Sequence, residues 1–152
     1  MHVWRLIKTR YASTAFDGEG ARRNGARWNS RGTRAAYASS NPALAILEVL
    51  VHMTSGGRFL GYSLIAATLD DAFIETRATS SLPKDWHAWP VPPHVQAIGD
   101  AWIQSRSAVA IRLPSAVVPA DHNILINPDH PEFKRLHIHS VEPFEFDPRL
   151  LD

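Results

Sequence analysis

The order of the regular segments constrains the fold of this chain more than any other feature. Short runs rich in apolar and β-branched residues recur along the 152 residues, and only two segments have the length and composition of a regular helix. A parallel α/β sheet needs strands and helices in regular alternation, which this order lacks. We therefore expect an α+β fold, and the chain is long enough to bury a hydrophobic core.

The expected strands are short and are separated by proline, glycine and polar residues. They cover residues 2–8, 34–39, 58–69, 108–113, 123–127 and 137–146. A further strand at 72–76 is expected to pair with 58–69, and a helical turn is expected near 131–136. Segments 17–34 and 80–93 are dense in turn-forming residues or in proline and tryptophan, so we expect them to be loops.

The two expected helices cover residues 42–53 and 95–105. Asn41 is suited to cap the first of them, and Pro42 is suited to its first turn. The glycine pair at 56–57 is a stop signal after it. Most residues of the first helix are apolar, so a broad face of it is expected to be buried.

Composition excludes several kinds of site and location. The chain has no cysteine, which excludes disulfides, a cysteine nucleophile and thiolate metal sites. No apolar run approaches the ~18 residues of a membrane span, and no stretch is typical of a secretion signal, so we expect the protein in the cytoplasm. Sixteen basic and fifteen acidic residues give a net charge of +1, which provides no global field for nucleic acid.

Arginines are concentrated in one stretch that has no acidic residue. Between Gly20 and Leu47 there is no Asp or Glu, whereas this stretch holds Arg22, Arg23, Arg27, Arg31 and Arg34. Arginine binds phosphates and carboxylates through two parallel hydrogen bonds, and glycines such as those at 25 and 32 permit close backbone approach to a ligand. The stretch favours a compact anionic ligand; the alternative is an exposed loop with solubilising arginines and Trp28 as a core residue. Neither common nucleotide-binding glycine motif is present.

Glu48 is the only acidic residue between positions 20 and 69. It lies on the expected helix 42–53, with His52 one turn later on the same narrow polar side. One interpretation is an ordinary solvated pair. The other is a carboxylate held by a rigid helix against a ligand, and the preceding arginine-rich stretch favours it.

Ser115 lies in the segment LPSAVVP, directly after an expected strand. A stiff turn can present a hydroxyl there, but the G-x-S-x-G context of a nucleophile is missing, so a plain turn serine is the alternative. Asn123 follows in a polar stretch. The eight histidines show no metal-ligand spacing, although His137 and His139 share a strand face, and we expect no metal site.

Four segments in this order resemble the RES-domain family, toxins of bacterial toxin–antitoxin pairs. They are GARWNSRGTRAAYASSNPALAILEVLVH at 25–52, GDAW at 99–102, LPSAVVP at 113–119 and NILINPDHPEF at 123–133. The resemblance covers nearly the whole chain and implies a single RES domain over residues 1–152. It also implies a fold similar to ADP-ribosyltransferase toxins, with a split, bent β core and helices around a cleft for NAD+.

The resemblance also implies roles for individual residues. Members of the family break the nicotinamide–ribose bond of NAD+ and pass ADP-ribose to a protein, phosphate or water. The arginine, glutamate and serine that name the family correspond to Arg27 as a phosphate or ribose clamp, Glu48 facing an oxocarbenium-like ribose, and Ser115 bonded to the nicotinamide–ribose side. Further candidates for substrate binding are Tyr37, Arg31, Arg10, Tyr11, His52 and Asn123.

The same resemblance implies a partner, because a toxin must be restrained. The expected partner is an antitoxin, usually a helix-turn-helix protein, that covers the cleft, and a target protein is one candidate acceptor. No metal and no membrane are expected. Two alternatives stand outside this interpretation: a nucleic-acid-directed toxin that uses the arginine-rich stretch on RNA phosphates, and a module that binds NAD+ without turnover. The near-neutral charge argues against the first.

Overall fold

The computed structural model describes residues 1–53 and 59–150. Their strands form one seven-stranded sheet in the order β4-β5-β6-β2-β1-β3-β7. The strands are β1 (His2–Lys8), β2 (Ala36–Ser39), β3 (Tyr62–Thr68), β4 (Ile74–Thr76), β5 (Ala110–Pro114), β6 (His122–Ile126) and β7 (His137–Phe144). Only β4 and β5 run parallel within this sheet, and helices are few, so the α+β prediction is confirmed.

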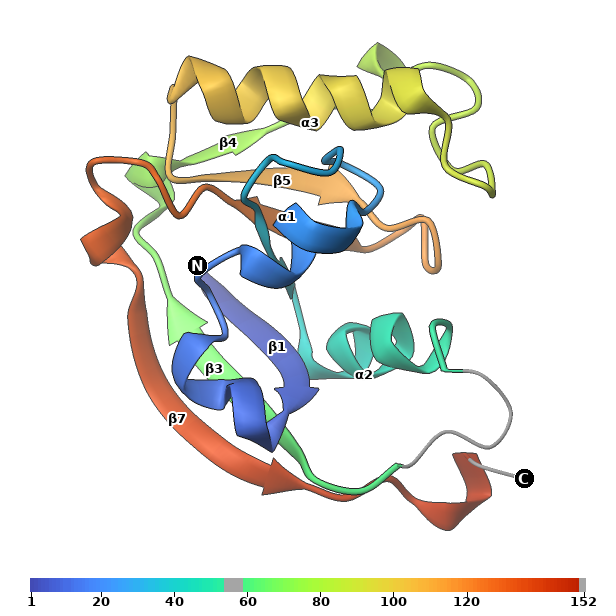
Figure 1. Ribbon diagram of the computed structural model, residues 1–152, viewed down its shortest axis with the longest axis vertical. Coiled ribbons are helices and arrows are strands. Elements are labelled where there is room, and N and C mark those ends of the chain that lie inside the picture. The colour runs from blue at the N-terminus through green and yellow to red at the C-terminus, as the bar shows by residue number, and fades with distance from the viewer. Residues whose placement is uncertain (54–58, 151–152) are drawn as a thin grey trace.

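The sheet consists of two well-paired parts that meet at a narrow junction. β1 pairs with β3 along its whole length, whereas β1 and β2 are joined in register at Trp4 and Ser39. A register shift between Ala66 and Ala67 interrupts the β3–β7 ladder, and such a bulge bends a strand. β7 accordingly curves around the lower part of the molecule (Figure 1). This is the split and bent core that the family resemblance implies.

Three α-helices lie among the described residues: α1 (Glu19–Asn24), α2 (Pro42–Leu50) and α3 (Pro93–Ser105). α2 begins as predicted, because the Asn41 side chain accepts a hydrogen bond from the Leu44 amide at 2.9 Å and proline occupies the first turn. Short 3-10 turns cover Thr9–Thr14, Asp71–Phe73, Thr79–Ser81, Phe133–Arg135 and Pro148–Leu150.

Strand alternation divides the buried residues between the two faces of the sheet. On one face, small and branched residues such as Ala36, Ala38, Ile124 and Ile126 form one core cluster. On the other face, α3 contributes Val95, Trp102 and Ile103 to a cluster with residues of β5 and β6. α2 packs against β1 on the second part of the sheet, and its Ala45 joins Leu6 of that strand in a third cluster. Figure 1 shows α2 and α3 well separated along the sheet.

Three details differ from the sequence-based expectations. Segment 17–34 contains α1 rather than being loop throughout. β4 pairs with β5 and not with the strand at 58–69, because the chain crosses to the far edge of the sheet after β3. The expected stop signal at 56–57 lies outside the described residues, and α2 ends earlier, at Leu50. Within the described ranges, no helix has the length and apolar character needed to cross a membrane.

Candidate active site

A cleft of about 1080 Å³ opens between the two helix-covered regions. Its volume lies slightly above the ~300–1,000 Å³ that is typical of small-molecule sites. β2 and β6 supply part of its floor, since Tyr37, Ser39 and Asn123 line it together. α2 contributes Glu48 and the segment 24–28 contributes Arg27. Residues of β1 line the cleft as well, so it brings together residues from both parts of the sheet.

Glu48 is held by two hydrogen bonds that converge on one carboxylate oxygen. Its Oε1 accepts from the Ser115 hydroxyl at 2.7 Å and from the side-chain amide of Asn123. The amide of Asn123 is itself oriented, because its oxygen accepts from the Ser39 hydroxyl at 2.9 Å. This network fixes the carboxylate at the wall of the cleft.

Ser115 lies behind Glu48 and not at the cleft surface. Its side chain is fully buried, and its hydroxyl oxygen accepts hydrogen bonds from the amides of Val117 and Val118 at 3.0 and 3.1 Å. Since the single hydroxyl proton is donated to Glu48, no donor is left for a substrate. This geometry favours a role for Ser115 in positioning the carboxylate over the expected hydrogen bond to the nicotinamide–ribose side.

Arg27 lines the same cleft as Glu48. Its Nη1 donates to the backbone oxygens of Trp86 at 2.8 Å and Ala88 at 3.1 Å. Burial lowers the pKa of Arg27, and the negative charge of Glu48 partly opposes that shift. One nitrogen thus ties the segment before α3 to the cleft, and the guanidinium interacts electrostatically with the Glu48 carboxylate.

The segment that carries Arg27 is fixed by α3. A Cβ atom on Gly99 would lie 1.7 Å from the backbone oxygen of Trp28, so only glycine permits this contact. Gln96 donates to the backbone oxygen of Ala26 at 2.9 Å, and the carboxylate of Asp100 accepts from the backbone amide of Ser30 at 3.0 Å. Gly99 and Asp100 of the GDAW motif therefore hold the segment that carries Arg27 in place.

Tyr37 lines the cleft floor with its hydroxyl already engaged. The hydroxyl donates to Asn29 Oδ1 at 2.7 Å and accepts from the Trp28 amide at 3.1 Å. Burial raises the pKa of Tyr37, so the side chain is neutral at physiological pH. Asn29 is itself fully buried and donates to three backbone oxygens of the same segment, so the RWN sequence supports its own conformation.

Arg5 is a cleft residue that sequence reasoning missed. It lies on β1, lines the cleft, and donates from Nη1 to the Tyr37 backbone oxygen at 2.7 Å. Its buried Nε has no hydrogen-bond partner. Burial lowers the pKa of Arg5 to about 10, so the group remains charged at neutral pH. The available signal was a single cation inside an otherwise apolar strand centre, Trp4-Arg5-Leu6.

The remaining candidates divide into two groups. His52 lines the cleft at its mouth, near the exposed ring of Trp89. Arg31 is exposed in a turn, and Arg10 stacks over the Tyr11 ring at 4.8 Å in the 3-10 turn after β1. The residues that line the cleft do not include these last three. No group of three potential metal-ligating side chains occurs in residues 1–53 and 59–150.

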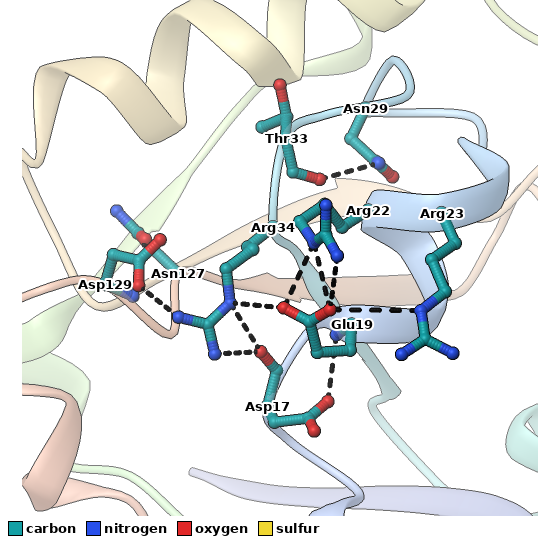
Figure 2. Close-up of polar contacts among 9 residues, drawn as sticks. All are labelled: Asp17, Glu19, Arg22, Arg23, Asn29, Thr33, Arg34, Asn127 and Asp129. Carbon is teal, nitrogen blue, oxygen red and sulfur yellow. Dashed lines mark hydrogen bonds and ion pairs between the residues drawn. The ribbon is translucent and has the colours of Figure 1, made fainter.

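Three of the five arginines in the arginine-rich stretch pair with acids that flank it or come from far along the chain. Glu19 pairs with Arg22 at 2.8 Å and with Arg34 at 3.3 Å, and Arg34 also pairs with Asp129 at 2.6 Å. Figure 2 shows these side chains gathered around Glu19, with Arg23 approaching from the other side. Arg22, Arg23 and Arg34 are therefore already engaged by carboxylates, which disfavours RNA phosphates as their ligand.

Comparisons with known proteins agree over nearly the whole chain. The RES domain profile matches residues 2–147. The chain is 35% identical to "Toxin Res" of Yersinia enterocolitica over 152 residues, covering 99% of each protein. It is also 35% identical to "Prs ADP-ribosylating toxin" of a Sphingobium species, covering 97% of this chain and 95% of that protein.

A solved structure supports the same fold. The toxin–antitoxin complex MbcT-MbcA of M. tuberculosis contains a chain that matches with a TM-score of 0.74 at 20% identity. The match covers 99% of this chain and 86% of the other. At this identity the likeness shows the fold.

Proposed function

This chain belongs to the RES-domain family, and from that premise we propose that it is a toxin of a toxin–antitoxin pair that cleaves the nicotinamide–ribose bond of NAD+. One observation carries the proposal. A carboxylate, Glu48, is held by Ser115 and Asn123 at the wall of a cleft that also contains Arg27 and Arg5. An anion fixed opposite cations matches a substrate with a negatively charged pyrophosphate and a reacting centre that becomes positive.

Glu48 supplies the charge that the reaction needs. When the bond between C1′ of the ribose and the nicotinamide nitrogen breaks, its electron pair leaves with neutral nicotinamide and the ribose becomes an oxocarbenium-like cation. A carboxylate fixed beside this cation stabilises the transition state without reorganisation. Asn123 and Ser115 act as positioning residues, since both bond to Glu48 Oε1.

Arg27 and Arg5 are proposed to bind the pyrophosphate. Both line the cleft and both keep guanidinium nitrogens beyond the one that binds backbone oxygens. Arginine suits phosphate because its planar group donates two parallel hydrogen bonds. Tyr37 offers its ring face at the floor, as its hydroxyl is engaged by Asn29 and Trp28.

The acceptor of ADP-ribose and the restraining partner complete the proposal. An oxygen nucleophile attacks C1′ of the cation, and a protein side chain, phosphate and water are the candidate acceptors. One relative is named as an ADP-ribosylating toxin, which supports a protein acceptor. The partner proposed is an antitoxin of the helix-turn-helix kind that covers the cleft, and the toxin–antitoxin complex with the same fold supports such a partner.

The test is product analysis of the purified protein with NAD+, in buffer alone, with phosphate, and with cell lysate. We expect release of nicotinamide together with ADP-ribose, a phosphorylated ADP-ribose, or a protein that gains one ADP-ribosyl group by mass spectrometry. NAD+ that remains intact under all three conditions would contradict the proposal, and RNA cleavage in the same lysate would favour the nucleic-acid alternative.

A further inference from the structure

The mouth of the cleft has an aromatic rim that the reaction described above does not use. Trp89 lines the cleft and is 74% exposed, whereas Trp28, Trp86 and Trp102 are buried. An exposed indole loses the favourable free energy of burial, and its open face is available for stacking. The position of this ring at a ligand cleft indicates a contact made only when a ligand is present.

The segment directly before Trp89 is anchored at two points. Trp86 stacks on Trp28 with ring centroids 6.2 Å apart and planes 15° apart. Arg27 binds the backbone oxygens of Trp86 and Ala88, directly before Trp89. Trp89 is therefore presented at the cleft by a fixed backbone, which lowers the entropic cost of binding a ligand there.

The residues directly after α2 supply the facing part of the rim. His52 lies one turn beyond Glu48, and its ring centroid is 6.4 Å from that of Trp89 with planes tilted by 54°. Val51 is 54% exposed and also lines the cleft. The rim is thus apolar and aromatic, in contrast to the charged interior formed by Arg5, Arg27 and Glu48.

We propose that Trp89, with His52 beside it, is a subsite that stacks a heteroaromatic base of the dinucleotide. This inference rests on the proposed function, because NAD+ places a charged pyrophosphate between two flat bases. The charged interior of the cleft suits the pyrophosphate and the ribose, so a base is the part of the substrate that reaches the rim. Every heteroaromatic base has a π-face that stacks on indole or imidazole.

Binding measurements on separate halves of the substrate test this subsite. Affinities for ADP-ribose, which carries adenine, and for nicotinamide mononucleotide are measured by calorimetry for the parent, Trp89→Ala and Trp89→Phe. Stacking of a base on an aromatic side chain predicts that Trp89→Ala weakens one of the two compounds at least about fivefold and that Trp89→Phe restores most of the loss. The compound that loses affinity identifies the base, while Ile138→Ala, an exposed apolar residue on β7 that does not line the cleft, is expected to bind both like the parent.

Two results would overturn the subsite. Parent-like affinity of Trp89→Ala for both compounds would mean that the ring contacts no base. An equal loss for Trp89→Ala and Trp89→Phe, with unchanged circular dichroism, would mean that stacking is not the interaction. These readouts need no turnover, so a parent that binds ADP-ribose but leaves NAD+ intact would contradict the cleavage activity and leave the stacking result interpretable.

Discussion

The two walls of the cleft are built in different ways. The first, which we call the Glu48 wall, comprises α2, the start of β6 and the turn 113–119, and its hydrogen bonds converge on one carboxylate oxygen. The second, which we call the Arg27 wall, comprises residues 24–31, α3 and the segment 86–89, and most of its contacts are made to backbone atoms. The Glu48 wall therefore fixes the position of one charge. The Arg27 wall fixes a backbone conformation, and several side chains depend on it.

The difference predicts that the walls fail differently when altered. A change at Glu48 itself removes one charge and leaves the backbone as it is. A change in the Arg27 wall moves the backbone, so it affects stability and several contacts together. Five substitutions, in order of decreasing effect, test this contrast.

Glu48→Gln is expected to have the largest effect. The substitution keeps the size of the side chain but removes the charge that faces the developing cation, so NAD+ turnover is expected to fall at least ~100-fold. The free energy of unfolding is expected to change little, because the amide can still accept from Ser115. Steady-state kinetics and denaturant unfolding measure both quantities. Glu132→Gln, which removes an exposed carboxylate paired with Arg135, is the matched control, and equal losses in the two variants would remove Glu48 from the mechanism.

Gly99→Ala should show the opposite pattern, with stability as the main loss. The added Cβ would meet the Trp28 backbone oxygen at 1.7 Å, so α3 and the arginine segment must separate. Overpacking of this kind costs about 1–3 kcal/mol or more in unfolding free energy. Gly20→Ala is the control, since nothing lies within 4 Å of its added Cβ and alanine favours a helix. A Gly99→Ala protein as stable as the parent would disprove the close contact.

The Glu48 wall could largely be predicted because its signals are local. Asn41 and Pro42 mark the start of α2, and both act there as expected. Glu48 stands out as a lone acid on an apolar helix, and the cleft is where its side chain points. Some apolar side chains that were expected to be buried are nevertheless exposed. Leu47 on α2 and Val51 directly after it are 38% and 54% accessible, because this region has the sheet on one side and the cleft mouth on another.

The Arg27 wall and the charge balance around it could not be predicted from local patterns. Arg27 binds backbone oxygens about 60 residues away, and Arg34 pairs with Asp129 across 95 positions of the sequence. The stretch has no acid in its own sequence, but the fold brings Glu19 and Asp129 to three of its arginines. Ser115 is a second example of this limit of local sequence patterns. Its motif identified the residue, but its hydroxyl bonds to Glu48 only because α2 packs beside it.

Ser115→Ala sharpens the distinction within the Glu48 wall. The variant removes one of two hydrogen bonds to Glu48 Oε1 and leaves the bond from Asn123. A hydrogen bond to a charged group is worth about 1.5–3 kcal/mol, so kcat is expected to fall roughly 10- to 150-fold while KM for NAD+ stays near the parent value. Complete inactivity of a folded variant, or an ADP-ribosyl adduct on Ser115 in the parent, would instead make the serine a nucleophile.

Arg27→Lys probes the Arg27 wall through substrate binding. Lysine keeps the charge but has no planar fork, so its three N–H donors cannot bind the Trp86 and Ala88 oxygens and also give a phosphate two parallel hydrogen bonds. We expect KM for NAD+ to rise by about tenfold, the effect of losing roughly 1.4 kcal/mol of binding. Arg23→Lys, on an exposed residue near Glu19, is expected to behave like the parent. Equal effects at both positions would mean that the stretch acts through bulk charge.

The smallest effect is expected from Asp121→Asn, and it concerns pH. Hydrogen bonds from Asn41 at 2.7 Å and Ser40 at 2.9 Å lower the pKa of Asp121, and the same carboxylate thereby ties the cap of α2 to the residues before β6. A folded-state pKa below that of the unfolded chain contributes stability above about pH 4, and this contribution disappears as the pH falls through the folded pKa. Asp121→Asn should therefore reduce the free energy of unfolding slightly at pH 7, and the difference from the parent should shrink between pH 4 and pH 2. Denaturant unfolding across this pH range measures the difference. Because the two bonds to Asp121 support only the Glu48 wall, the affinity for ADP-ribose at pH 7 is expected to be unchanged. A stability difference that does not depend on pH would show that the carboxylate contributes through its shape and not through its charge.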